Sequence, residues 1–161
     1  MQTDQEFALL AQQYMDLVYR VALSCVRHPA DADDVTQNTM LRLCRSKVTF
    51  QTEEHARRWL IRVAVNESKR LLTAPWRSRT FSLEELAASL PAQPQEEREV
   101  LSAVLALPRK YRLPLYLYYY EGYSVSEIAA ILRRNPSTVQ THLARGRDQL
   151  KAALLEVSEH G

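Results

Sequence analysis

The spacing of apolar residues near the start of the chain is the feature that most constrains its fold. From Phe7 onward they recur every three or four positions, and the positions between them are mostly polar. Such spacing predicts an amphipathic helix with one face turned toward a core. The members of this stripe are Phe7, Leu10, Ala11, Tyr14, Leu17, Val18, Val21, Ala22 and Cys25.

Helical character extends over the whole chain. Its 161 residues include only three glycines, and alternating β-branched runs are missing. Leu, Ala, Arg, Glu and Gln dominate, and all of these residue types favour helices. We therefore expect an all-α fold with no sheet. A chain of this length suits one medium domain or two small ones.

Two further helices are predicted in the first half of the chain. Pro29 interrupts the first helix, and the second is expected over about residues 31–45, with acids suited to its first turn. Residues 46–55 form a loop, and a basic third helix is expected over about 56–72. The predicted core residues of the two helices are Ala32, Val35, Thr39 and Leu43, then Leu60, Val63, Ala64 and Leu71.

A change in composition divides the chain. Residues 74–95 contain three prolines with Ser, Ala and Gln between them, which is typical of a linker. Within it, Ser82–Leu86 has capping-box spacing and predicts a short helical turn. We therefore expect two small helical domains, residues 1–73 and 96–158, joined by a flexible linker.

The second domain begins with two apolar segments. The first, from Val100 to Leu107, ends at a proline, and the second contains Pro114, which is expected to bend or cap its helix. Gly122 then permits a sharp turn.

The last third of the chain has the pattern of a helix-turn-helix. Ser124 and Glu127 fit a capping box, which predicts that a short helix begins directly after Ser124. Arg133-Arg134 form the turn, and Asn135-Pro136 begin the next helix as N-cap and first helical residue.

The second helix of such a motif presents its first residues to base edges in the major groove. Gln pairs with adenine, Arg pairs with guanine, and Thr contacts the thymine methyl group. The candidates here are Ser137, Thr138, Gln140, Thr141, His142 and Arg145. On spacing alone, a helical hairpin with a polar face and no DNA partner remains an alternative.

Charge and composition limit the function classes. The net charge of +2 means that any affinity for nucleic acid must come from local patches. Neither a secretory signal nor an apolar stretch of about 18 residues is present, so we expect a cytoplasmic protein without membrane insertion. No metal cluster, phosphate loop or nucleophile constellation appears, so we expect neither a cofactor nor enzymatic activity.

The two cysteines, Cys25 and Cys44, stand far apart. Cys25 lies on the apolar stripe of the first helix and is expected to be a buried thiol. A metal site with Cys25 and His28 is the alternative, although further ligands with a recognisable spacing are missing.

Three separated motifs, in the right order, give the chain a resemblance to RNA polymerase sigma factors of the extracytoplasmic-function type. Residues 31–42 read DADDVTQNTMLR and resemble the family's D-A-E-D-L-V-Q-E-T-F-L-R. Residues 59–66 read WLIRVAVN and resemble its W-L-x-R-I-A-x-N. Residues 107–112 and 119–124 match its approach to the helix-turn-helix, where Ile128-Ala129 and Thr138-Val139 also coincide with family positions.

The resemblance implies that the first domain contacts the polymerase. It places five side chains of the second helix against the β′ clamp helices, whereas spacing alone favours a plain solvated face. These residues are Asp33, Asp34, Gln37, Asn38 and Leu41.

The resemblance also implies a surface for the melted −10 element on the loop and third helix, with Arg57, Arg58, Lys69 and Arg70 on the strand backbone. Holding an extruded base costs a few kcal/mol of unstacking, and aromatic stacking recovers about 1–3 kcal/mol per base. The residues of this surface are Phe50, Arg58, Trp59, Arg62, Asn66, Lys69 and Arg70.

The second domain is implied to bind the −35 element as duplex DNA and to contact the polymerase β flap. An anti-sigma factor that covers the polymerase and DNA surfaces is a further implied partner. The implied −35 residues are Arg134, Pro136, Ser137, Thr138, Gln140, Thr141, His142 and Arg145.

The chain departs from the family pattern at two places. Arg133-Arg134 stand where relatives often have glycine and an apolar residue, and a left-handed arginine costs roughly 1–2 kcal/mol. Asn38 stands where an acid is usual.

Two other classes of protein fit parts of the pattern. A stand-alone regulator would bind operator DNA through the helix-turn-helix and would usually dimerise to read paired half-sites. A helical adaptor without DNA would retain its activity after replacement of Gln140 and Arg145 by alanine.

Overall fold

The structure is a computed structural model that describes residues 4–74 and 95–160. These residues form seven helices, and no strand occurs among them, so the all-α prediction is confirmed. The chain divides into two compact units, unit 1 (Met1–Arg79) and unit 2 (Thr80–Gly161). Most of the predicted linker, including the short turn at Ser82–Leu86, lies outside the described residues.

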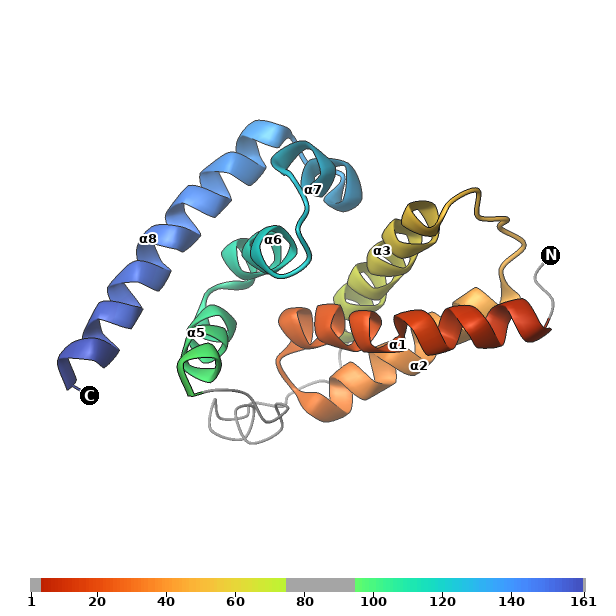
Figure 1. Cartoon of the computed structure of the whole chain (residues 1–161), viewed down its shortest axis with the longest axis horizontal. Helices are drawn as coiled ribbons and strands as arrows, with labels where there is room; N and C mark the ends of the chain where they lie inside the picture. The colour runs from red at the N-terminus through yellow and green to blue at the C-terminus, as the bar shows by residue number, and fades with distance from the viewer. Residues whose placement is uncertain (1–3, 75–94, 161) are drawn as a thin grey trace. The chain divides into compact units, whose positions relative to one another are not determined.

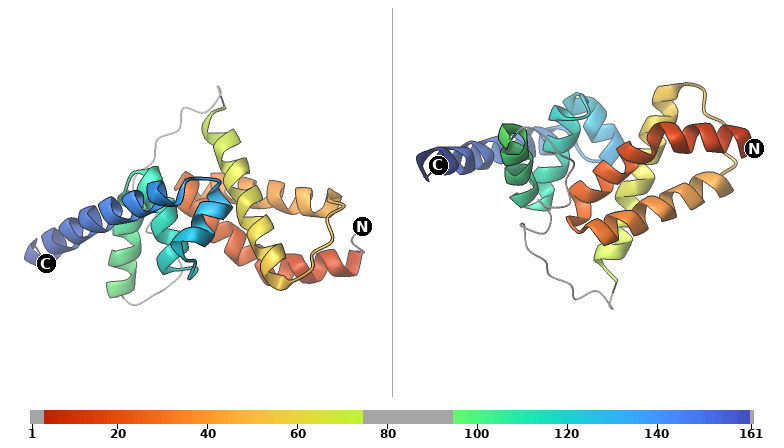
Figure 2. Two further views of the ribbon diagram at one scale, coloured as in Figure 1. Left: turned by 90° about the horizontal axis from the view of Figure 1, so that it is seen from above. Right: turned by 60° about the horizontal axis from the view of Figure 1, so that its bottom comes forward.

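Unit 1 consists of three helices, α1 (Asp4–Val26), α2 (Pro29–Arg45) and α3 (Glu53–Leu72). α1 and α2 run antiparallel and side by side (Figure 1), and α3 packs against both of them (Figure 2). The predicted α1 stripe faces the core from Ala11 onward, whereas Phe7 and Leu10 are only half-buried. The side chains with almost no exposure include Val18, Val21, Val35, Leu43, Leu60 and Ile61.

Two helices of unit 1 begin earlier than predicted. Pro29 is the first residue of α2. The N–H at this position has no acceptor within the helix, so proline loses no hydrogen bond there. His28 caps this helix, because its Nδ1 accepts from the Asp31 backbone N–H at 3.4 Å. Thr52 caps α3 in the same way, with its Oγ1 accepting from the His55 N–H at 3.0 Å.

The buried face of α3 is broader than predicted. Leu60 and Ala64 are buried as expected, whereas Val63 and Leu71 are only half-buried. Ile61 and Val65 are also buried. Since α3 contacts both α1 and α2, its core face spans more of the helix than a single stripe would.

Unit 2 consists of α5 (Gln95–Ala106), α6 (Arg109–Tyr119), α7 (Val125–Leu132) and α8 (Pro136–His160). α8 packs against each of the other three helices. Pro114 was expected to bend or cap its helix; it lies inside α6, so it does not cap the helix. The turn between α6 and α7 contains Gly122 with a φ of +75°, a conformation that favours glycine.

A buried arginine connects α5 to α6. Arg112 is 3% exposed, and its Nη1 donates to the Leu107 carbonyl at 2.7 Å. This hydrogen bond satisfies a carbonyl at the end of α5. The apolar pattern of the sequence did not indicate a buried cation here.

Gly146 lies where α8 meets α6. A Cβ added to it would lie 2.7 Å from Leu115 Cδ1 and 3.1 Å from Tyr111 Cβ. A larger side chain must therefore push α6 and α8 apart.

Gly146→Leu is expected to destabilise unit 2 by about 1–3 kcal/mol, because it overpacks a close helix contact. The free energy of unfolding, measured by urea denaturation, checks this. Ala144→Leu is the matched control, since Ala144 is exposed on the same helix. Equal stability of the two variants would contradict a close contact at Gly146.

Candidate nucleic-acid and partner interfaces

The outer face of α2 carries all five side chains predicted to contact the polymerase. Each of them is exposed, and Leu41, at 49%, is one of the large apolar side chains left in solvent. The threonines of this helix point inward, and the hydroxyls of Thr36 and Thr39 donate to backbone carbonyls one turn earlier. The outer face therefore combines acids, amides and one leucine.

A groove beside this face also involves α1, which the sequence analysis did not assign to a site. Phe7 and Met15 line it from α1, opposite Gln37 and Leu41 of α2. Met15 is 45% exposed. The outer face of α2 is therefore continuous with an apolar strip, and this combination suits a protein partner.

The loop before α3 is organised by an aromatic cluster. The Phe50 ring meets His55 and Trp59 edge-on, with centroids 5.2 and 5.5 Å apart. His55 also accepts the Gln51 N–H on its Nδ1 at 3.3 Å. Trp59 is half-buried, so its packing against Phe50 fixes the loop relative to α3.

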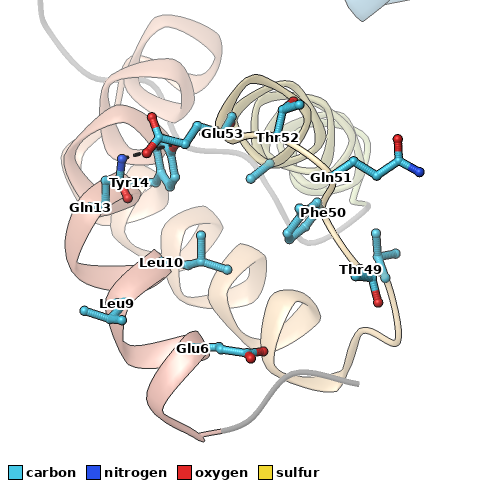
Figure 3. Close-up of a pocket in the computed structure, with 12 residues that line it drawn as sticks. Glu6, Leu9, Leu10, Gln13, Tyr14, Thr49, Phe50, Gln51, Thr52 and Glu53 are labelled. Carbon is cyan, nitrogen blue, oxygen red and sulfur yellow. Dashed lines mark hydrogen bonds between the residues drawn. The ribbon is translucent and has the colours of Figure 1, made fainter.

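A pocket of about 550 Å³ lies between this loop and α1 (Figure 3). Phe50 points into it toward Leu10, whereas Gln51 points away. Tyr14 closes one side, and its hydroxyl donates to the Glu53 carbonyl at 3.3 Å. Burial, and next the Glu53 carboxylate, raise the pKa of Tyr14, so its hydroxyl remains protonated. The pocket lining combines apolar side chains such as Leu10 and Phe50 with polar ones such as Gln13.

The predicted −10 residues of α3 lie three or four positions apart along one side of the helix. Asn66, Lys69 and Arg70 are exposed, and Arg58 and Arg62 are half-buried. Arg58 pairs with Glu54 one turn earlier at 2.9 Å. This side of α3 carries more cations than acids.

Glu67 is the α3 residue that the sequence analysis left without a role. It is 6% exposed, and its carboxylate pairs with Arg42 of α2 and with Arg70. Glu67 is the one acid in the residues 56–72 predicted for this helix, which was the sequence signal, but its partner Arg42 lies 25 positions away.

The helix-turn-helix of unit 2 forms as predicted. Both halves of the capping box between Ser124 and Glu127 are present. Arg133 has φ 52° and ψ 51°, and its N–H and that of Arg134 bond back to the end of α7. The turn therefore uses the left-handed conformation despite the absence of glycine. Asn135 starts α8, with its Oδ1 accepting from the Ser137 N–H at 3.0 Å.

The first turns of α8 separate into two faces. Val139 and Leu143 are buried against the unit, and the candidate DNA residues other than His142 and Arg134 are exposed. The Thr141 hydroxyl donates to the Ser137 carbonyl at 3.0 Å. The exposed candidates are Pro136, Ser137, Thr138, Gln140, Thr141 and Arg145.

His142 lies on the inward side of α8. Its ring meets Tyr111 edge-on with centroids 5.6 Å apart. Its Nδ1 is buried and accepts no hydrogen bond in the described structure. Burial, followed by Arg134, Lys110 and Arg145, lowers the pKa of His142. This ring packs in unit 2 rather than facing outward.

The described residues do not support the alternative of a metal site with Cys25 and His28. No three His, Cys, Asp or Glu side chains are grouped there so that they could hold an ion. Cys25 is 2% exposed, as expected of a buried thiol. A bilayer-spanning helix is likewise absent from the part of the chain that the structure describes.

Two family models match the chain, one on each unit. Residues 10–78 match Sigma-70 region 2, and residues 97–150 match Sigma-70 region 4. The first match covers the aromatic loop and the outer face of α2, and the second covers the helix-turn-helix.

Relatives that align with most of this chain agree with both matches. The chain is 30% identical to the ECF RNA polymerase sigma factor SigM of Bacillus subtilis, over 88% of this chain and 90% of that protein. It is 31% identical to SigE of Mycolicibacterium smegmatis over 92% of this chain, but spans only 62% of that relative. The chain therefore belongs to the extracytoplasmic-function (ECF) RNA polymerase sigma factors.

Solved structures share the fold. A structure of the sigma factor RpoE with the anti-sigma factor NepR from Bartonella quintana aligns with a TM-score of 0.73 at 18% identity, over 93% of this chain and 97% of that one. CnrH, solved with the cytosolic domain of CnrY, aligns with a TM-score of 0.69 at 26% identity, over 96% of this chain and 90% of that one.

The predicted sigma-factor function in transcription initiation is confirmed by these matches. Nothing in them supports a stand-alone regulator, whose operator-binding domain would not need a region 2 unit.

The stability of unit 2 is expected to fall as the pH drops below about 6.5, the unfolded value for histidine. The folded unit holds His142 neutral with a lowered pKa. Its contribution is therefore complete above that pH and is lost as the pH falls toward the folded pKa. Melting of wild type and His142→Gln between pH 5 and 8 checks this, since the variant should lose part of the acid dependence. An NMR titration midpoint for His142 at or above 6.5 would contradict it.

Proposed function

We propose that unit 1 binds core RNA polymerase and holds the melted −10 strand, while unit 2 docks on the −35 element as duplex. The observation that carries this proposal is the ordered pair of region 2 and region 4 matches, one on each compact unit. Opening DNA and reading intact duplex need different surfaces, and the two units present them separately.

For the polymerase contact we propose the outer face of α2. Asp33, Asp34, Gln37 and Asn38 supply polar groups around Leu41, and the groove with Met15 adds apolar area. An apolar centre within a polar rim is the usual arrangement of a protein interface. The β′ clamp helices are the proposed partner of this face.

For the melted −10 strand we propose the loop with Phe50 and the outward side of α3. The pocket between the loop and α1 would receive one extruded base, with its apolar side chains against the ring and its polar side chains against the base edge. Phe50 would offset the unstacking cost by stacking on this base, and Trp59, which lies outside the pocket, would stack on a neighbouring one. Arg57, Arg58, Arg62, Lys69 and Arg70 would hold the backbone, and Asn66 adds an exposed amide.

For the −35 element we propose the exposed start of α8. Gln140 and Arg145 carry the bidentate groups that read adenine and guanine, and Thr138 offers a methyl group. Ser137, Thr141, Pro136 and Arg134 would position the helix on the backbone. We leave His142 out of the base-reading set, since its ring packs on Tyr111.

Further partners follow from the family. The β flap would hold unit 2, and an anti-sigma factor would cover the polymerase and DNA surfaces, as NepR accompanies RpoE. We propose a cytoplasmic location beside the polymerase and no enzymatic activity of its own, because the polymerase carries out the chemistry.

Run-off transcription with purified core polymerase across a promoter library from the same genome tests the proposal. We expect initiation at a small set of promoters that share −35 and −10 elements. Initiation at none of them, with active core confirmed by a second sigma factor, would overturn it.

Leu41→Ala is expected to weaken binding to core polymerase about fivefold to thirtyfold, as truncation of an apolar side chain at the centre of an interface does. Titration of labelled protein with core polymerase measures it. Leu9→Ala is the control, because Leu9 is a similarly exposed leucine of the same unit that lies on α1, outside the groove with Met15. Equal losses in the two variants would remove Leu41 from the interface.

Gln140→Ala and Arg145→Ala are each expected to lose about 1–3 kcal/mol of −35 binding and to relax preference at one base pair. Transcription from single-base variants of the −35 element measures the preference. Gln149→Ala, an exposed position farther along α8, should keep it. Unchanged preference in both test variants would refute base reading by this face.

A further inference from the structure

A second groove in unit 1 lies between α2 and α3 and shares Leu41 with the groove that contains Met15. Arg42 and Arg45 line it from α2, and Trp59, Glu67 and Arg70 line it from α3. Its volume is about 610 Å³. Asn38, Leu41, Ser46 and Val63 complete the lining, so the groove adjoins the face of α2 that is proposed to contact the polymerase.

The groove has an excess of positive charge, and a buried carboxylate fixes the position of two of the cations. Three arginines line it, and Glu67 is the one acid among its lining residues. The Glu67 carboxylate accepts from Arg42 Nε and, at 3.3 Å, from Arg70 Nη1. Two guanidinium groups from different helices therefore share one buried carboxylate.

The same two guanidinium groups remain open to solvent. The side chains of Arg42 and Arg70 are 52% and 68% exposed, whereas Glu67 is 6% exposed. A guanidinium has five N–H donors, and each arginine gives one of them to Glu67 in the described contacts. The remaining donors lie at the mouth of the groove, where an anion can accept them.

We propose that this groove binds a phosphate of the single-stranded DNA, with Arg42, Arg45 and Arg70 as its donors and Glu67 as the residue that positions them. The inference rests on the proposed role of unit 1 at the −10 element and extends the strand path from α3 onto α2. Neither Arg42 nor Arg45 is part of the −10 surface proposed above.

The lining favours a nucleic-acid strand over an acidic protein segment. Trp59 forms one wall, and aromatic rings beside cations are typical of single-strand grooves, where the base stacks and the phosphate pairs. Planar guanidinium groups also match phosphate oxygens two at a time. An acidic peptide would pair with the arginines but would leave the exposed part of the tryptophan face unused.

The test measures the salt dependence of binding to a fluorescein-labelled single strand of mixed sequence. The full chain is titrated alone and after assembly with core polymerase. Arg45→Gln is expected to weaken binding about threefold to fivefold and to reduce the slope of log K against log salt by about 0.7, the value for one phosphate on a single strand. Arg20→Gln removes the same charge from α1, outside the groove, and should leave the slope unchanged.

Glu67→Gln distinguishes the positioning of the two arginines from the effect of the net charge of the groove. The substitution makes the groove more positive, so charge alone predicts tighter binding to DNA. Loss of the carboxylate that holds Arg42 and Arg70 predicts weaker binding instead, and we expect an affinity lower by at least threefold. The melting temperature of each variant verifies that unit 1 is folded. Arg42→Lys provides a second variant, which keeps the positive charge but lacks the planar guanidinium group.

Three results would overturn the proposal. They are an unchanged slope for Arg45→Gln, equal or tighter binding for folded Glu67→Gln, and a loss of core polymerase affinity in Arg45→Gln without a loss of DNA affinity. The last would assign the groove to a protein partner. Titration of the chain alone does not depend on promoter activity, so failure of the groove and failure of the sigma-factor assignment are distinguishable.

Discussion

Each unit depends on burying the apolar stripes of a few short helices against one another. In unit 1, α3 contacts both α1 and α2, so three helices share one core that includes Val18, Leu43 and Ile61. A helix in such an arrangement buries one face and leaves another in solvent. The proposed binding surfaces of this protein are those remaining faces, and their geometry is fixed by the core behind them.

This arrangement explains why some positions of a helix are buried in the core while their neighbours are exposed. On α2, Val35 and Leu43 hold the helix to the core, while Leu41 stays in solvent. On α8, Val139 and Leu143 do the same beneath Gln140. Rigid packing under each exposed face keeps the side chains in register for a partner, so little ordering is required when the partner binds.

Local signals accounted for the parts of the structure that were predicted. The capping box of Ser124 and Glu127 and the Asn135-Pro136 pair depend on neighbours in sequence, and both helix starts are observed there. The early start of α2 was also a local matter, since Pro29 suits a first helical position. Reading that proline only as the end of α1 delayed the predicted start.

The features that escaped prediction depend on contacts distant in sequence. Glu67 is buried because Arg42 reaches it from another helix, and periodicity within α3 cannot reveal that partner. Histidine is a residue type that can contact a base, yet the ring of His142 faces Tyr111. Its position three residues after buried Val139 was the signal for inward packing, and the polar character of histidine concealed it.

Two arginines, Arg27 and Arg133, end helices in the left-handed region, with φ of 59° and 52°. Glycine avoids the steric cost of roughly 1–2 kcal/mol that each residue carries there. The protein tolerates this strain at the ends of α1 and α7, directly before the helices that carry the proposed polymerase and duplex faces. Glycine at either position would relieve the strain but would remove a cation next to a proposed binding surface, so stability and binding would favour different residues there.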